Sequence, residues 1–177
     1  MKLVFIRHTS VAVAPGVCYG QSDVPLAPTF ETEAAEVVRR LAPYKFDRVY
    51  CSPLSRCRRL AAYCGYNGPQ IDSRLMEMNF GEWEMKRYDE ITDPRLELWY
   101  ADFVNVRATG GESSMEQRAR LTDFINEVKN TAAADETVAI FTHGGIVIHA
   151  LATLAGMTDT EAFAAQPGYG AIVEIDI

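Results

Sequence analysis

The chain has 177 residues, which is enough for one substantial core and short for two, so its length predicts a single domain over 1–177. Hydrophobic residues make up 48% and charged residues 23%, a balance that is ordinary for a globular protein and excludes a mostly disordered chain. The formal net charge is −7 and the Lys and Arg residues are scattered along the chain, which argues against a nucleic-acid partner.

The first part of the chain alternates strand-like and helix-like patterns. In order, these patterns predict a strand over 2–7, a helix over 29–43, a strand over 48–51 and a helix that ends near 64. The dipeptide Ser52-Pro53 predicts where this second helix begins, because Ser is a good N-cap and Pro is accepted in a first helical turn.

The rest of the chain continues this alternation after an irregular segment. We expect a short extended piece near 70–75, a helix over 113–133, a strand over 137–142, a helix over 145–156 and a final strand over 171–176. Between them, the aromatic-rich stretch within 76–110 reads as a cap-like insertion. Alternation of apolar strands with helices predicts an α/β fold, a three-layer α/β/α sandwich around a mainly parallel sheet.

Nothing in the sequence has the pattern of an export signal or a membrane anchor. No apolar stretch reaches the roughly 18 residues of a membrane span, so we expect a cytoplasmic protein without membrane contact. The cysteines lack C-x-x-C and zinc-like spacing, and we expect them to be reduced thiols; they are Cys18, Cys51, Cys57 and Cys64.

Three of the predicted strands are followed directly by polar side chains. These are Arg7-His8 after the first strand, Ser52 to Arg56 after the second, and His143-Gly144-Gly145 after the strand over 137–142. Ligands of open α/β sheets bind beyond the carboxyl ends of the strands, where helix N-termini add backbone N–H donors. If these strands are neighbours, two imidazoles and two guanidiniums form a pocket for a small anion.

The residue types in this pocket suit a phosphate ester. Arg7 and Arg56 can clamp phosphate oxygens in bidentate fashion. A neutral imidazole is a good nucleophile toward phosphorus, which makes His8, beside Arg7, the candidate nucleophile and His143 the partner that stabilises the transferred group. The departing alkoxide also needs a proton donor. The spacing in the sequence does not decide among four candidate carboxylates, which are Glu77, Glu82, Glu84 and Asp89. Glu77 is the nearest of them to a strand end.

Five ordered motifs together resemble those of the histidine phosphatase superfamily, the phosphoglycerate mutase-like family. They are Arg7-His8-Thr9, Ser52-Pro53-Leu54-Ser55-Arg56, Leu75-Met76-Glu77 with Phe80-Gly81-Glu82-Trp83-Glu84, Gly110-Gly111-Glu112-Ser113 and His143-Gly144-Gly145. The sequence from Val17 to Leu26 is most similar to α-ribazole phosphatases of the cobalamin nucleotide-loop pathway. The resemblance implies a phosphoglycerate mutase-like fold and covers nearly the whole chain.

The resemblance also implies roles for individual residues. It places a phosphohistidine intermediate on His8, phosphate binding on Arg7, Arg56 and His143, and proton transfer on Glu77, with no metal and no cofactor. The chain departs from the family at Ala14, where mutase-type members commonly carry an Asn phosphate ligand. We expect Thr9 or a backbone N–H to take that place, and the missing Cβ of Gly144 to allow phosphate to approach closely.

The function implied is a metal-independent phosphomonoesterase whose partner is a small phosphomonoester, α-ribazole 5′-phosphate or adenosylcobalamin 5′-phosphate. A general sugar or glycolytic phosphate phosphatase, or a phosphoglycerate mutase, is the alternative with the same chemistry. A non-catalytic phosphate-binding protein would need neither His8 nor Glu77. A metal site on His8 and His143 is disfavoured because the adjacent Arg7 would repel the cation. The sequence does not indicate an oligomeric state.

Two further features have less specific interpretations. We expect the aromatic residues of the insertion to form a local core; they are Phe80, Trp83, Trp99, Tyr100 and Phe103. The second interpretation is that they stack on a flat base of the substrate, which a substitution of Trp83 would test. His149 lies within a predicted helix and is expected to be structural or to line the rim of the pocket.

Overall fold

The computed structural model describes all residues from 1 to 177 and is built on a five-stranded sheet. Its strands are β1 (Lys2–Arg7), β2 (Arg48–Cys51), β3 (Gln70–Ile71), β4 (Thr137–Thr142) and β5 (Ile172–Asp176). Their order across the sheet is β3-β2-β4-β1-β5, and only β5 is antiparallel to its neighbour. The prediction of a mainly parallel sheet is therefore confirmed.

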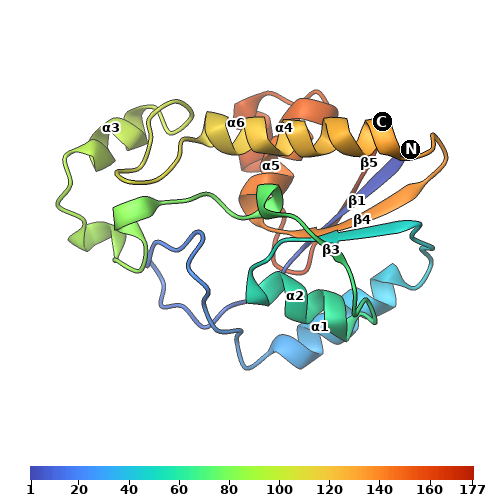
Figure 1. The fold of residues 1–177 in the computed structure, drawn as a ribbon. Helices are drawn as coiled ribbons and strands as arrows, with labels where there is room; N and C mark the ends of the chain where they lie inside the picture. Colours follow the sequence, from blue (N-terminus) through green and yellow to red (C-terminus); the bar gives the residue numbers. More distant parts are fainter.

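Helices cover both faces of this sheet, as Figure 1 shows. Helices α1 (Phe30–Leu41) and α2 (Ser55–Tyr63) pack on one face, and α4 (Ser114–Thr131), α5 (Gly144–Leu154) and α6 (Asp159–Ala164) lie on the other. Alternate side chains of β1 enter the two layers, because successive residues of a strand point to opposite faces. Leu3 and Phe5 pack with α4 and α5, whereas Val4 and Ile6 pack with α1 and α2. The predicted three-layer α/β/α sandwich is confirmed.

The predicted start of the second helix is wrong by two residues. Helix α2 begins at Ser55 with Leu54 as its N-cap, and no side chain caps it. The Ser52 hydroxyl instead lies 2.7 Å from Nε2 of His143, so the polar group that suggested a cap serves the neighbouring strand end. By contrast, the predicted start of the long helix is confirmed, since Ser113 caps α4 in a reciprocal capping box with Glu116.

Five short helical segments were not anticipated, and two of them are the 3-10 helices Gly81–Trp83 and Tyr88–Glu90 of the irregular stretch. The expected extended piece over 70–75 holds only the two residues of β3, followed by the 3-10 helix Ser73–Leu75. Helix α3 (Arg95–Ala101) lies inside the irregular stretch, and α6 follows α5 after a capping box on Thr158. Neither α3 nor α6 is long enough to present a clear apolar period in sequence.

The segment over 76–110 lies to one side of the sheet, at the left of Figure 1, and has a small core of its own. That core contains Cys18, Trp83, Leu96 and Ala108. The Trp83 indole N–H donates to Asp93, 2.8 Å away, which satisfies the polar edge of a buried ring. All four cysteines are free thiols. None of the helices combines the length and the apolar character that crossing a bilayer requires.

Candidate active site

Strand register brings the three predicted strand ends together. Arg7 of β1 pairs with Thr142 of β4, and Cys51 of β2 pairs with Phe141 of the same strand. The residues that follow therefore emerge side by side at one edge of the sheet. The rings of His8 and His143 meet edge to face with their centroids 5.2 Å apart. The structure thus brings together the two imidazoles that the sequence predicted to share a cleft.

His8 has one ring nitrogen held and the other free. Its Nδ1 lies 2.7 Å from the carbonyl oxygen of Thr9. A carbonyl can only accept a hydrogen bond, so Nδ1 carries the proton and Nε2 retains its lone pair. Burial, followed by the charge of Arg56, lowers the pKa of His8 to about 3, and the ring is neutral at physiological pH. Such a ring has the protonation state and tautomer of a nucleophile.

His143 uses both of its ring nitrogens within the protein. Nδ1 accepts from Nε of Arg56 at 3.3 Å, and Nε2 contacts the Ser52 hydroxyl at 2.7 Å. Since an Arg N–H can only donate, Nε2 carries the proton of the neutral ring. Burial, and then repulsion between the two imidazoles if both were protonated, keep the pKa of His143 well below its usual value. The ring is therefore a neutral, fixed link between α2, β2 and the start of α5.

The two predicted arginine clamps are placed differently. Arg56 is completely buried and donates to the carbonyls of Gly20 and Ser22 at 2.6 and 2.9 Å. Arg7 lines the open cavity, donates from Nη1 to the Pro167 carbonyl at 2.5 Å, and keeps a buried Nε–H with no partner in the protein. A buried donor without a partner is costly, and an anion in the cavity would satisfy it.

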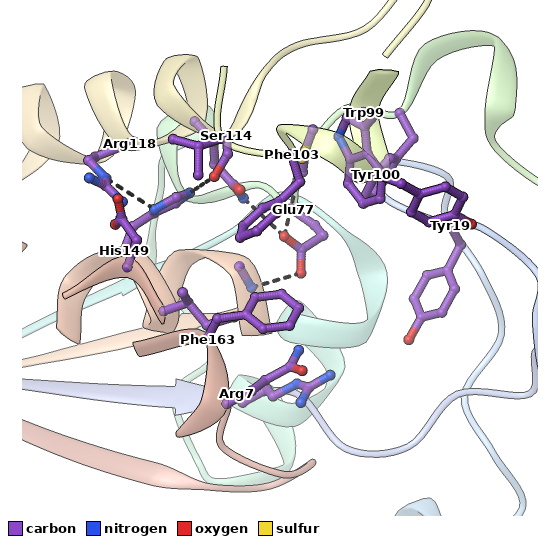
Figure 2. A pocket seen from close by; sticks show the side chains of 18 of the residues that line it. Arg7, Tyr19, Glu77, Trp99, Tyr100, Phe103, Ser114, Arg118, His149 and Phe163 are labelled. Carbon is purple, nitrogen blue, oxygen red and sulfur yellow. Dashed lines mark hydrogen bonds and ion pairs between the residues drawn. The ribbon is translucent and has the colours of Figure 1, made fainter. Parts of the chain in front are cut away.

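Glu77 is the one predicted carboxylate that enters the cavity. It accepts from the backbone N–H of Met78 at 2.8 Å, from Gln117 at 2.9 Å and from the backbone N–H of Gly145 at 3.1 Å. Burial alone would raise the pKa of Glu77, but the hydrogen bond from Gln117 and the two backbone donors outweigh it and lower the pKa. The carboxylate is therefore ionised and held at the N-terminus of α5, and Figure 2 marks hydrogen bonds to it with dashed lines.

The other three candidate carboxylates have different surroundings. Glu84 accepts from the backbone of Gln21 at 2.8 Å and of Ser22 at 2.6 Å, which fastens the loop whose carbonyls hold Arg56. Asp89 pairs with a neighbouring Arg on the surface, and Glu82 is exposed. None of the three lines the cavity.

The glycines at the start of α5 allow close packing around the site. A Cβ on Gly145 would lie 2.3 Å from Oε1 of Glu77, so only glycine permits the N–H contact to that carboxylate. A Cβ on Gly144 would lie 3.1 Å from Cζ of Arg7. Gly144 and Thr9 are both buried and do not line the cavity, and the Thr9 hydroxyl has no hydrogen-bond partner in the protein.

A cavity of about 530 Å³ opens above these residues. One side of it, which we call the aromatic wall, consists of Phe80, Trp99, Tyr100, Phe103 and Phe163. Figure 2 shows Phe103 and Phe163 around Glu77 in the middle of the view, with Trp99, Tyr100 and Tyr19 to the right. The expectation of a local core is confirmed for Trp83, but Tyr100 is exposed and lies on the wall. Trp83 is therefore the wrong residue at which to test stacking.

Sequence reasoning missed three residues of the site. Ser52 was assigned to a helix cap and is instead a partner of His143. Gln117 was overlooked, although it occupies a buried position one helical turn before Leu121 on the apolar side of α4, an unusual place for an amide. Tyr169 stacks on Arg7, with its ring centre 4.4 Å from Cζ, and follows a loop that carries no readable pattern.

Comparison with known proteins agrees with this geometry. The family model described as "Histidine phosphatase superfamily (branch 1)" matches residues 3–177. The chain belongs to this superfamily. The assignment confirms the predicted family and class, that of a phosphatase.

Individual histidine phosphatases resemble the chain along most of its length. It is 32% identical over 166 residues to the adenosylcobalamin/alpha-ribazole phosphatase of Salmonella typhimurium, a match that covers 89% of this chain and 81% of that protein. The crystal structure of the alpha-ribazole phosphatase from Shigella flexneri superposes with a TM-score of 0.90 at 26% identity, over 100% of this chain and 91% of that one. A mycobacterial glucosyl-3-phosphoglycerate phosphatase shares the fold, with a TM-score of 0.84 at 23% identity and coverage of 98% and 88%.

Proposed function

We propose that this chain is a metal-independent phosphomonoesterase that acts through a phosphohistidine on His8, and that its substrate is α-ribazole 5′-phosphate. The observation that carries the chemistry is the tautomer of His8, whose Nδ1–H bond to Thr9 leaves Nε2 free in a cavity that Glu77 also lines. A binding protein would need neither group. The Salmonella and Shigella relatives support the choice of substrate.

In the first step, Nε2 of His8 attacks phosphorus and forms an N–P bond while the ester P–O bond breaks. The bonding electrons pass to the leaving oxygen, which takes a proton from Glu77. Arg7 and Arg56 neutralise charge on the equatorial oxygens, and the N-terminus of α5 adds backbone donors. When phosphate binds, the Nε2–H of His143 exchanges its hydrogen bond to Ser52 for one to a phosphate oxygen. The Thr9 hydroxyl or a backbone N–H near Gly144 takes the place of the missing Asn ligand.

In the second step, water attacks the phosphohistidine and regenerates the enzyme. The N–P bond breaks and its electrons return to Nε2 of His8, while the water proton passes to Glu77. Phosphate leaves, and Glu77 then gives its proton to solvent and returns to the ionised state of the free enzyme. All atoms and charges balance without a metal or another cofactor.

The lowered pKa of Glu77 has to rise when substrate binds, since an ionised carboxylate cannot donate a proton. Repulsion between like charges provides this change, because a phosphate dianion beside the carboxylate disfavours its ionised form. The three hydrogen bonds that hold Glu77 keep it in place in both protonation states. The carboxyl group therefore becomes an acid only when there is a leaving group to protonate.

Two features of the cavity support a leaving group with a flat ring system. The aromatic wall offers faces on which a benzimidazole can stack, and such contacts are worth about 0.5–1.5 kcal/mol each. Tyr100 is largely exposed at the mouth, so the cavity leaves room for a larger molecule that carries the same ester. Adenosylcobalamin 5′-phosphate is such a molecule, and we include it in the proposal.

Phosphate release from a panel of esters, without added metal, tests reaction class and substrate together. We expect kcat/KM for α-ribazole 5′-phosphate to exceed that for 3-phosphoglycerate and ribose 5-phosphate by at least about a hundredfold. Excess chelator should leave these rates unchanged. Equal efficiency across the panel would favour a general phosphatase, interconversion of phosphoglycerates would favour a mutase, and no turnover would favour a binding protein.

A further inference from the structure

A second polar cluster lies in the same cavity, away from the two facing histidines. It is formed by Ser114 and Arg118 of α4, His149 of α5 and Asp159 of α6. Figure 2 shows His149 between Arg118 and Ser114, at the opposite side of the view from Tyr19. The mechanism proposed above uses none of these four residues.

Hydrogen bonds fix the orientation of every group in this cluster. Nδ1 of His149 accepts from Nε of Arg118 at 3.3 Å, so Nε2 carries the proton and faces the Ser114 hydroxyl at 3.3 Å. Burial, followed by the charge of Arg118, lowers the pKa of His149 to about 4, which keeps the ring neutral. Arg118 also pairs with the carboxylate of Asp159. The charges of the cluster therefore sum to zero.

The groups that remain available to a ligand are a mixture of donors and acceptors. Ser114 can still donate its hydroxyl proton, Arg118 keeps the N–H bonds of Nη1, and Asp159 keeps a second carboxylate oxygen. A sugar hydroxyl is both a donor and an acceptor and carries no charge. A second phosphate or a carboxylate would meet Asp159 and find no net positive charge to balance it.

The cluster lies within reach of a sugar attached to the leaving oxygen. Gly145, whose N–H holds Glu77, and His149 are one helical turn apart on α5, a rise of about 6 Å. Ser114 and Gln117, which also holds Glu77, are spaced by three residues on α4 and share a face. Two facing helices thus hold the carboxyl of Glu77 through Gln117 and Gly145 and, one turn further, present Ser114, Arg118 and His149 of the neutral cluster.

We propose that Ser114, Arg118 and Asp159 bind the vicinal hydroxyls of the substrate's ribose and select against leaving groups that carry a second negative charge. His149 is a positioning residue that holds Arg118 and Ser114. This inference rests on the proposed phosphatase activity and extends it to the part of the substrate between the phosphate and the base.

The first test compares substrates with and without the diol. The wild-type enzyme should show a KM for 2′,3′-dideoxy-α-ribazole 5′-phosphate about tenfold above that for α-ribazole 5′-phosphate, with kcat nearly unchanged, since two hydrogen bonds are lost far from phosphorus. Phenyl phosphate, which has no hydroxyl groups, reports on the catalytic groups alone. Equal kcat/KM for the two ribazole esters would overturn the inference and leave the proposed function intact.

The second test changes the charge of the cluster. Asp159→Asn leaves Arg118 without its carboxylate, so the cluster becomes positive. We expect the KM for α-ribazole 5′-phosphate to rise about tenfold and kcat/KM for 3-phosphoglycerate to increase several-fold, while phenyl phosphate is unaffected. Asp123→Asn makes the same chemical change at an exposed position of α4 outside the cavity and should alter none of these values.

A purely structural role for Asp159 predicts a different result. If it only tethers α6 to α4, Asp159→Asn should lower all three activities together, and the preference among substrates should stay constant; that pattern would refute the inference. If phenyl phosphate is hydrolysed but neither ribazole ester is, the proposed substrate is wrong and the inference falls with it.

Discussion

The two sides of the cavity are built in opposite ways. The phosphate floor, by which we mean His8 at the cavity and Ser52, Arg56 and His143 packed behind it, is 0–2% exposed and fixed by hydrogen bonds between strand ends. The aromatic wall comes from the irregular segment and from α6, and its Tyr100 and Phe163 are 58% and 53% exposed. In the proposed mechanism the attack on phosphorus thus rests on the rigid sheet, whereas stacking against the base of the leaving group rests on short, exposed elements.

This difference follows from how each side is specified. The floor depends on the register of three central strands, and a one-residue slip would reverse the direction of every side chain. The wall depends on loops and short helices that contribute little to the two main cores. Changes in the wall should therefore alter substrate choice while leaving fold and mechanism intact.

The largest effect should come from the floor. His8→Ala removes the nucleophile, and we expect turnover to fall by at least about ten-thousandfold, since water cannot use the same first step. Steady-state phosphate release measures this, and an unchanged melting temperature shows that the fold is intact. Activity within tenfold of the wild type would mean that another residue attacks phosphorus.

Glu77→Gln should have a smaller effect that depends on the leaving group. An amide cannot donate a proton to the alkoxide, so we expect kcat for α-ribazole 5′-phosphate to drop about a hundred- to a thousandfold. p-Nitrophenyl phosphate, whose leaving group needs little protonation, should lose far less. Glu82→Gln is the control, because Glu82 is exposed outside the cavity. An equal loss on both substrates would show that Glu77 acts only by holding the site together.

The three buried histidines, two of the floor and His149 of the second cluster, should also make stability depend on pH. His8 and His149 have pKa values of about 3 and 4, and the pKa of His143 is well below its usual value, whereas an unfolded histidine titrates near 6.5. Below pH 6.5 the unfolded chain binds protons that the folded chain cannot, so the stabilisation is complete above pH 6.5 and is lost as the pH falls toward 4. Each histidine contributes roughly 1 kcal/mol per pH unit.

Urea unfolding at pH 7, 6 and 5 measures this dependence. The His8→Ala variant should lose about a third of the slope, because one of three histidines is gone. A free energy of unfolding that stays constant between pH 6.5 and 5 would show that these rings can accept protons in the folded protein.

The smallest effect should come from the wall. Tyr100→Ala removes a stacking surface at the mouth, and we expect a three- to tenfold higher KM for α-ribazole 5′-phosphate, corresponding to about 0.5–1.5 kcal/mol, with kcat unchanged. Glycerol phosphate should show no difference. Tyr63→Ala, at a similarly exposed tyrosine of α2 outside the cavity, is the matched control. An unchanged KM would show that the base of the substrate does not stack on Tyr100.

The floor was predictable from sequence because its signals are local. The apolar runs that end in Arg7-His8 and His143-Gly144 predict both the strand and the polar group at its carboxyl end. Parallel neighbouring strands bring such ends together at one edge of the sheet. Ser52 shows the limit of this reasoning. A serine before a proline and a helix suggests a cap, and only the tertiary contact with His143 reveals its other partner.

For the aromatic wall, the sequence predicted only that aromatic residues are frequent in one segment. The sequence shows that aromatic residues gather in the segment over 76–110, but burial of Trp83 and exposure of Tyr100 depend on how short, irregular pieces pack. Phe163 reaches the same wall from α6, a helix too short to be recognised by periodicity. Residues brought together across such distances in the chain leave no pattern for sequence reasoning to detect.

Trapping the intermediate tests the central claim most directly. Wild-type enzyme mixed with α-ribazole 5′-phosphate and quenched within milliseconds should contain an acid-labile, alkali-stable phosphate that peptide mass spectrometry locates on His8, and the Glu77→Gln variant should form it more slowly. Turnover without any phosphoenzyme, or phosphate found on a residue other than His8, would contradict the account.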